Sequence, residues 1–68
     1  MRFDYTNGNR PTHCVSVYNW SLNDIFYYDD YEKAKAKYDT VSAKKWSKGT
    51  IVSLNDMTKG ERKEHVRF

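Results

Sequence analysis

The chain has 68 residues, enough for a single domain spanning residues 1–68. Its 12 lysines and arginines outnumber its 9 aspartates and glutamates, so a net charge of +3 favours anionic partners without the density of a DNA-binding tail. The single cysteine excludes an internal disulfide, argues against a cysteine-based zinc site, and suits a reducing cytosol.

The first part of the chain predicts three strands. Residues 2–6, R-F-D-Y-T, alternate polar and aromatic side chains and run into Asn7-Gly8, a pair that favours a tight hairpin turn because both residues accept positive φ angles. Residues 13–20, H-C-V-S-V-Y-N-W, are rich in β-branched and aromatic residues. Residues 21–24, S-L-N-D, predict a four-residue turn, after which I-F-Y-Y at 25–28 returns antiparallel.

A helix is predicted to follow. Asp30 is a favourable N-cap residue, and Gly49 suits the position just beyond the C-terminal end of the helix. Apolar residues spaced three or four apart mark the buried stripe of this helix: Tyr31, Ala34, Tyr38 and Val41.

The last part of the chain predicts two more strands. Residues 50–56, T-I-V-S-L-N-D, alternate again, M-T-K-G at 57–60 favours a turn, and residues 61–68 form a charged edge strand. The order is therefore β-β-β-α-β-β. We expect an α+β fold in which one helix packs on one face of an antiparallel sheet of four to five strands.

One helix covers only one face of such a sheet, so strand alternation decides which side chains stay uncovered. Tyr28 lies two residues before the helix N-cap, so the chain turning into the helix should bury it. The residues that strand alternation and pairing place on the same face as Tyr28 are also expected beneath the helix: Val15, Val17, Phe26, Val52, Leu54 and Val66. The uncovered face is expected to carry Tyr18, Trp20, Ile25 and Tyr27, with Ile51, Ser53, His65 and Arg67 on the neighbouring strands.

The predicted functional surface is this aromatic patch with cations at its rim, since exposed apolar patches commonly mark interaction sites. Two interpretations stay open: a homo-oligomer interface that supports a marginal core, and a platform where the flat ring of a small anionic, nucleotide-like ligand stacks. The candidate residues are Tyr18, Trp20, Ile25, Tyr27, His65 and Arg67. A one-residue slip in the turn at 21–24 would bring Phe26 and Tyr28 onto this face instead.

A second candidate surface is a basic stripe on the helix. At about 100° per residue, one narrow stripe carries Lys33, Lys37, Lys44 and Lys48, which could follow the phosphates of a nucleic acid. The alternative is a solvated face with local pairs such as Lys35 with Asp39. The helix carries no arginine, the residue that bidentate phosphate contacts prefer, and this favours the solvated face.

No catalytic, metal or cofactor site is predicted. His13 and Cys14 are neighbours on a strand and point to opposite faces, and His13 and His65 lack a third ligand at metal spacing. No stretch is long and apolar enough for a membrane span or a signal peptide. We therefore expect a non-enzymatic binding protein of the cytoplasm that has no membrane partner.

Two segments resemble the small open reading frames common in phages: V-Y-N-W-S-L-N-D-I-F-Y-Y-D-D-Y-E-K-A-K-A-K-Y at 17–38 and I-V-S-L-N-D-M-T-K-G at 51–60. The likeness is a hairpin, an aromatic–acidic helix start, a helix and another hairpin; Lys33 stands where such helices often carry a second glutamate. It implies a protein that acts in an infected or host bacterial cell by blocking a host enzyme or defence complex, or by sequestering a nucleotide signal. The resemblance assigns no functional role to any individual residue of this chain.

Overall fold

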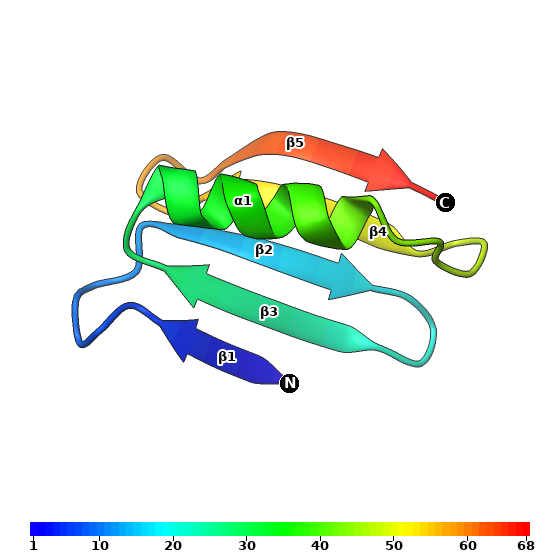
Figure 1. Cartoon of the computed structure of the whole chain (residues 1–68), viewed down its shortest axis with the longest axis horizontal. Coiled ribbons are helices and arrows are strands. Elements are labelled where there is room, and N and C mark those ends of the chain that lie inside the picture. The colour runs from blue at the N-terminus through cyan, green and yellow to red at the C-terminus, as the bar shows by residue number, and fades with distance from the viewer.

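In the computed structural model, which describes residues 1–68, five strands form one sheet and a single helix lies across it (Figure 1). The elements in chain order are β1 (Arg2–Tyr5), β2 (His13–Tyr18), β3 (Asn23–Tyr28), α1 (Tyr31–Ser42), β4 (Ile51–Asp56) and β5 (Glu61–Arg67). The strand order across the sheet is β1-β3-β2-β4-β5. The predicted α+β class and the β-β-β-α-β-β order are confirmed.

Strand β1 departs from the prediction, because it pairs in parallel with β3 and makes the sheet mixed rather than antiparallel. The predicted tight turn does form: Asn7 and Gly8 have φ angles of 55° and 84°, and the Asn9 amide donates to the Thr6 carbonyl over 2.9 Å. The turn does not close a hairpin onto β2, since β3 and β4 already occupy both edges of β2.

Aromatic stacking holds β1 against β3. The Phe3 ring stacks on Phe26 with 4.7 Å between centroids, and the Tyr5 ring stacks on Tyr28 at 5.4 Å. Such pairs contribute about 0.5–1.5 kcal/mol each beyond the burial of their area. We call these four residues the aromatic strip. It lies on the helix side of the sheet, at the edge where β1 extends clear of the helix (Figure 1).

The β2–β3 hairpin closes earlier than predicted. Its connection is residues 19–22, not 21–24, so Tyr18 pairs with Asn23. The Asn19 side chain stabilises this turn by accepting from the Ser21 amide at 2.8 Å, and the Asn19 amide donates to the Leu22 carbonyl over 2.9 Å. The connection moves by two residues but keeps its length, so no strand residue changes face and the predicted division into two faces survives.

The helix begins as predicted and ends early. The Asp30 carboxylate accepts from the Glu32 amide at 3.2 Å, which confirms the N-cap. The helix stops at Ser42, well before Gly49. At its C-terminal end the Val41 carbonyl accepts from the Trp46 indole over 2.8 Å and from the Lys44 amide over 3.2 Å, which satisfies a last-turn acceptor.

The core lies between α1 and the three central strands. Eight apolar residues are buried there: Val15, Val17, Tyr28, Ala34, Tyr38, Val41, Val52 and Leu54. Phe26 and Val66, also expected beneath the helix, are half-buried at its margin, and Tyr31 of the predicted stripe is 42% exposed. The helix thus covers one face of the sheet and leaves the other free for contacts.

Candidate ligand-binding face of the sheet

The face of the sheet opposite the helix is crossed by three rows of paired residues, which we call the open face. The first row is Arg2, Ile25, Ser16, Ser53 and His65. The second row is Asp4, Tyr27, Cys14, Asn55 and Arg62. The third row is Asn23, Tyr18, Ile51 and Arg67. Side chains of one row lie next to one another across neighbouring strands.

Five of the six predicted site residues lie on the open face: Tyr18, Ile25, Tyr27, His65 and Arg67. Tyr18 is the most accessible aromatic residue among them, with 56% of its surface exposed. Trp20 does not belong to the sheet. It lies in the connection between β2 and β3 and is 71% exposed. Its ring lies next to Gly49, where a Cβ atom on residue 49 would be 3.5 Å from the ring.

Sequence reasoning missed two arginines of the open face. Arg2 joins it because β1 pairs with β3, an arrangement that no local signal in residues 2–6 distinguishes from a hairpin. Arg62 joins it because β5 has a bulge opposite Leu54 and Asn55, so that Lys63 is an extra residue. Without this bulge, simple alternation would place Arg62 on the opposite face from His65.

The arginines of the open face have no carboxylate partner. The six ion pairs of the structure involve lysines, the amino terminus and His13, and none includes Arg2, Arg62 or Arg67. Asp4 is the only acidic residue in the three rows. The Thr6 hydroxyl and amide donate to its carboxylate at 2.7 Å and 3.0 Å, and these bonds lower the pKa of Asp4. The face therefore presents free guanidinium groups.

Two open hollows lie at opposite edges of this face. The β5 hollow, of about 240 Å³, is lined by Ile51, Arg62, His65 and Arg67. Tyr18 continues the row of Arg67 and Ile51, two strand spacings or about 10 Å from Arg67. This hollow therefore combines two guanidinium groups with an imidazole, and an exposed phenol ring lies within reach.

The β1 hollow, of about 440 Å³, is lined by Arg2, Asp4, Pro11 and Tyr27. It repeats the pairing of one arginine with one tyrosine at the other end of the rows. Tyr27 is half-buried and therefore less accessible than Tyr18.

Short polar side chains fill the centre of the open face. The Ser16 and Ser53 hydroxyls share a hydrogen bond, and the Asn55 amide donates to Ser53 Oγ at 3.2 Å and to Cys14 Sγ at 3.6 Å. Burial raises the pKa of the Cys14 thiol, which keeps it protonated and a poor nucleophile. The centre is neutral and lower than the tyrosines and arginines around it.

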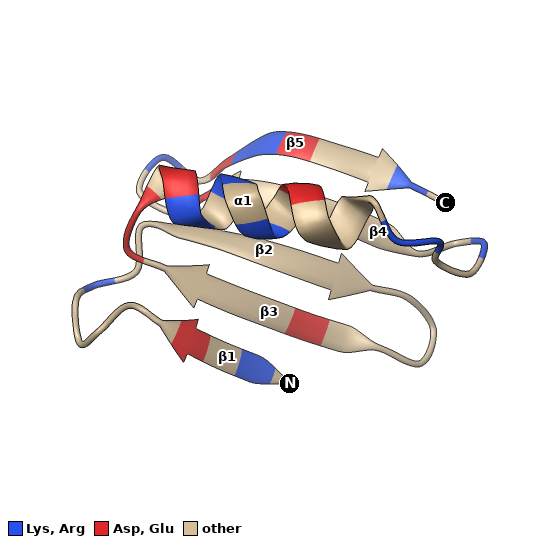
Figure 2. Ribbon diagram, in the orientation of Figure 1, with Lys and Arg blue, Asp and Glu red and all other residues tan.

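The predicted lysine stripe is only partly helical. Because α1 ends at Ser42, Lys33 and Lys37 belong to the helix, whereas Lys44 and Lys48 lie in the connection to β4 (Figure 2). The predicted pair of Lys35 with Asp39 is confirmed at 3.1 Å.

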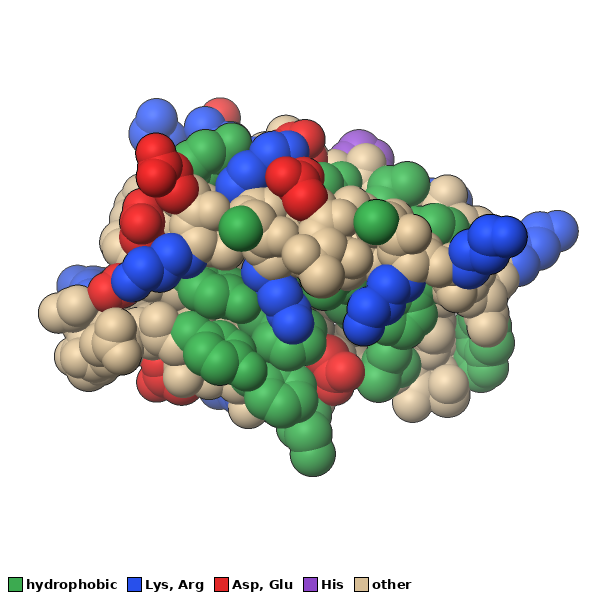
Figure 3. Space-filling model, viewed as in Figure 1, with side chains coloured by type: hydrophobic (Ala, Val, Ile, Leu, Met, Phe, Trp, Pro, Cys, Tyr) green, Lys and Arg blue, Asp and Glu red, His purple; other side chains and the backbone are tan.

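Three lysines of the stripe already have contacts within the chain. Lys33 Nζ is 3.6 Å from Asp29 Oδ1, Lys37 Nζ is 4.3 Å from the centre of the Phe26 ring, and Lys44 Nζ is 6.0 Å from that of Trp46. Lysine side chains are spaced along the helix next to the apolar surface of the sheet edge (Figure 3). Contacts within the chain thus engage three of the four lysines of the stripe.

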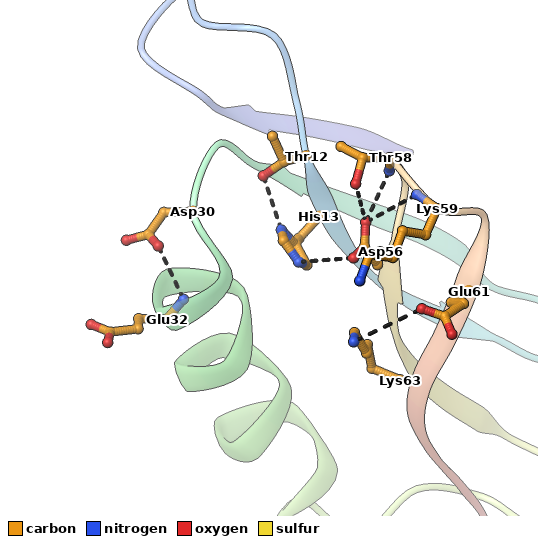
Figure 4. Close-up of polar contacts among 9 residues, drawn as sticks. All are labelled: Thr12, His13, Asp30, Glu32, Asp56, Thr58, Lys59, Glu61 and Lys63. Atoms are coloured by element: carbon orange, nitrogen blue, oxygen red, sulfur yellow. Dashed lines mark hydrogen bonds and ion pairs between the residues drawn. The ribbon is translucent and has the colours of Figure 1, made fainter.

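A hydroxyl, an imidazole and a carboxylate meet where β2 begins and β4 ends (Figure 4). His13 Nδ1 is hydrogen-bonded to the Thr12 hydroxyl at 2.9 Å, and His13 Nε2 is 3.8 Å from Asp56 Oδ2. The other carboxylate oxygen, Asp56 Oδ1, accepts from the Thr58 hydroxyl and amide and from the Lys59 amide. The cluster therefore links β2 to the turn after β4.

No protein-family model matches the chain, and neither a curated protein nor a solved structure gives a significant match. No three histidine, cysteine, aspartate or glutamate side chains gather where they could hold a metal ion. The one helix is too short and too polar to cross a membrane.

Proposed function

We propose that this protein is a non-catalytic binding protein whose open face takes an anionic ligand with a flat ring, such as a nucleotide. The observation that carries the proposal is the set of three arginines without carboxylate partners, Arg2, Arg62 and Arg67, on the same sheet face as two tyrosines. Free guanidinium groups bind phosphate through two parallel hydrogen bonds and lose little hydration in doing so.

The β5 hollow suits the two parts of a nucleotide. A phosphate between Arg62 and Arg67 would meet two positive charges, with His65 as a further donor. The base would lie over Ile51 and Tyr18 in the same row. Stacking of a base on an aromatic ring contributes about 1–3 kcal/mol.

The open face is a better candidate than the lysine stripe. Lysines 33, 37 and 44 already contact a carboxylate or a ring, and an ammonium group binds phosphate without the geometric match of a guanidinium. A nucleic acid on the stripe would have to displace these contacts.

Binding of nucleoside monophosphates, measured by titration calorimetry, tests the proposal. Arg67→Ala and Tyr18→Leu should each weaken binding about tenfold, which corresponds to about 1.4 kcal/mol. Lys45→Ala makes the same charge change outside the open face, and Tyr31→Leu removes an exposed tyrosine on the helix; both should bind as the parent does. If no monophosphate binds, or if the controls weaken binding equally, the proposal fails.

The alternative partner is a host protein, which the resemblance to small phage proteins also suggests. An interface of that kind would depend on Tyr18, Ile25 and Ile51 rather than on the arginines. Its affinity would change little with salt, whereas the affinity for a phosphate ligand falls as salt rises. Inhibition of a host enzyme or defence complex could follow from either kind of binding.

A further inference from the structure

The arginines of the open face lie at its two edges. Arg2 belongs to β1 at one edge of the sheet, and Arg62 and Arg67 belong to β5 at the other. The strand order places four inter-strand spacings between these edges, or about 19 Å at 4.8 Å each. One mononucleotide cannot reach both groups of arginines.

Each edge has its own arginine, with a tyrosine farther in on the same face. Arg67 of β5 shares a row with Tyr18 of the central strand β2, and Arg2 of β1 lines one hollow with Tyr27 of β3. We call these two arginine–tyrosine pairs the two units; both face the same side of the sheet.

The path between the two units is low and neutral. It passes over the hydrogen-bonded side chains of Ser16, Ser53 and Asn55, which offer hydroxyl and amide groups and no charge. Asp4 lies beside Arg2 in the β1 hollow; one oxygen of its carboxylate accepts from the Thr6 hydroxyl, and no ion pair joins it to Arg2. A polyanion crossing the sheet would therefore meet an arginine at each end and uncharged side chains between them.

We infer that the open face binds single-stranded nucleic acid laid across the strands, with one phosphate near Arg67 and another near Arg2. This inference rests on the proposed function and extends it from one nucleotide to a strand. A single strand fits better than a duplex, because its bases are free to stack on Tyr18 and Tyr27, whereas a duplex hides the faces of its bases.

A comparison of the affinities for a short and a long ligand tests this inference. Calorimetry or fluorescence anisotropy would compare nucleoside monophosphates with an unstructured oligonucleotide of about eight nucleotides, a length within the range bound by small single-strand binding domains. The oligonucleotide should bind at least about tenfold tighter, because it reaches the second unit.

Arg2→Ala separates the two units. It should weaken oligonucleotide binding, reduce the salt dependence of that binding by about 0.7 in the log–log slope, and leave monophosphate binding unchanged. Arg67→Ala should weaken both ligands, and Lys45→Ala serves as the charge-matched control that alters neither slope. Arg2 is exposed and makes no ion pair, so its replacement should leave the fold intact.

The outcomes distinguish the two claims. If monophosphates bind through Arg67 but the oligonucleotide binds no tighter, or Arg2→Ala has no effect on it, the strand inference is overturned and the nucleotide proposal stands. A duplex of the same length that binds equally well would overturn the single-strand assignment. If neither ligand binds, both claims fall.

Discussion

The carboxylate of Asp56 organises the turn between β4 and β5. It accepts from the Thr58 hydroxyl at 2.6 Å and from the amides of Thr58 and Lys59, and it faces His13 across 3.8 Å. These hydrogen bonds, that of the Thr58 hydroxyl above all, hold the pKa of Asp56 below its usual value of 3.8. The ionised form is therefore favoured by folding.

Stability in acid should depend on this carboxylate. Because its pKa is lower in the folded state, its contribution is complete above the unfolded pKa of 3.8 and is lost as the pH falls through the folded value. We predict that Asp56→Asn lowers the melting temperature by several degrees at pH 7 and less below pH 3.8, measured by circular dichroism across pH.

The control for Asp56 is Glu61→Gln. Glu61 is exposed and has one ion pair, with Lys63 at 3.9 Å. Exposed pairs contribute little to stability. Equal losses in the two variants at pH 7, or a loss at Asp56 that does not shrink in acid, would contradict the prediction.

The bulge in β5 determines which side chains this strand presents on the open face. The extra residue, Lys63, lets Arg62 share a side with His65 and Arg67 although their numbers differ in parity. Bulges commonly redirect a side chain near a functional site in this way. Because Lys63 is the bulged residue, the β5 hollow presents the guanidinium group of Arg62 rather than the ammonium group of Lys63.

Deleting either of the two residues at the bulge tests this arrangement. We predict that deletion of Lys63 keeps monophosphate binding, because Arg62 then directly precedes Glu64 and still lies opposite Asn55 in a regular ladder. Deletion of Arg62 puts Lys63 in that place, and should weaken binding as much as Arg62→Lys does. Calorimetry gives the affinities, and amide NMR spectra verify the fold; a Lys63 deletion variant that folds but loses binding would refute this role of the bulge.

At the scale of the whole molecule, eight buried apolar residues form a small core. A chain of this size buries only about 60% of its unfolded surface, so its stability is marginal. Self-association, predicted from the sequence on this ground, would add buried area. Pairing two open faces would bring six unpaired arginines together, three from each copy, and like charges across an interface cost several kcal/mol.

We predict that self-association uses the aromatic strip instead. Tyr5 is 48% exposed there and belongs to the edge strand β1, whereas Tyr18 belongs to the open face. Native mass spectrometry should find a dimer that Tyr5→Lys abolishes and Tyr18→Lys preserves. A parent protein that is monomeric throughout, or a dimer lost only with Tyr18→Lys, would show the prediction to be wrong.

Local patterns in the sequence were enough to predict the two faces of the sheet. The period of two along each strand assigned Tyr18, Ile25 and Tyr27 to the open face even though the predicted hairpin register was wrong. The N-cap at Asp30 was also predictable, since capping involves neighbouring residues.

Features that depend on distant contacts were not predictable. β1 pairs with β3 and stacks Phe3 on Phe26, which are far apart in the chain. The helix ends at Ser42 rather than near Gly49, where the Trp46 indole donates to the Val41 carbonyl, and the place of Arg62 depends on a bulge. Two of the three arginines of the candidate site were therefore missed.

The parallel pairing of β1 has a consequence for the order of folding. Arg2 lies opposite Ile25, and β1 occupies the outer edge of β3. β1 precedes β3 in the chain, so it has no edge to dock on until β3 has formed, and closing the loop between the two strands costs chain entropy. The arginine at the β1 edge is therefore positioned only by a strand that is synthesised after it.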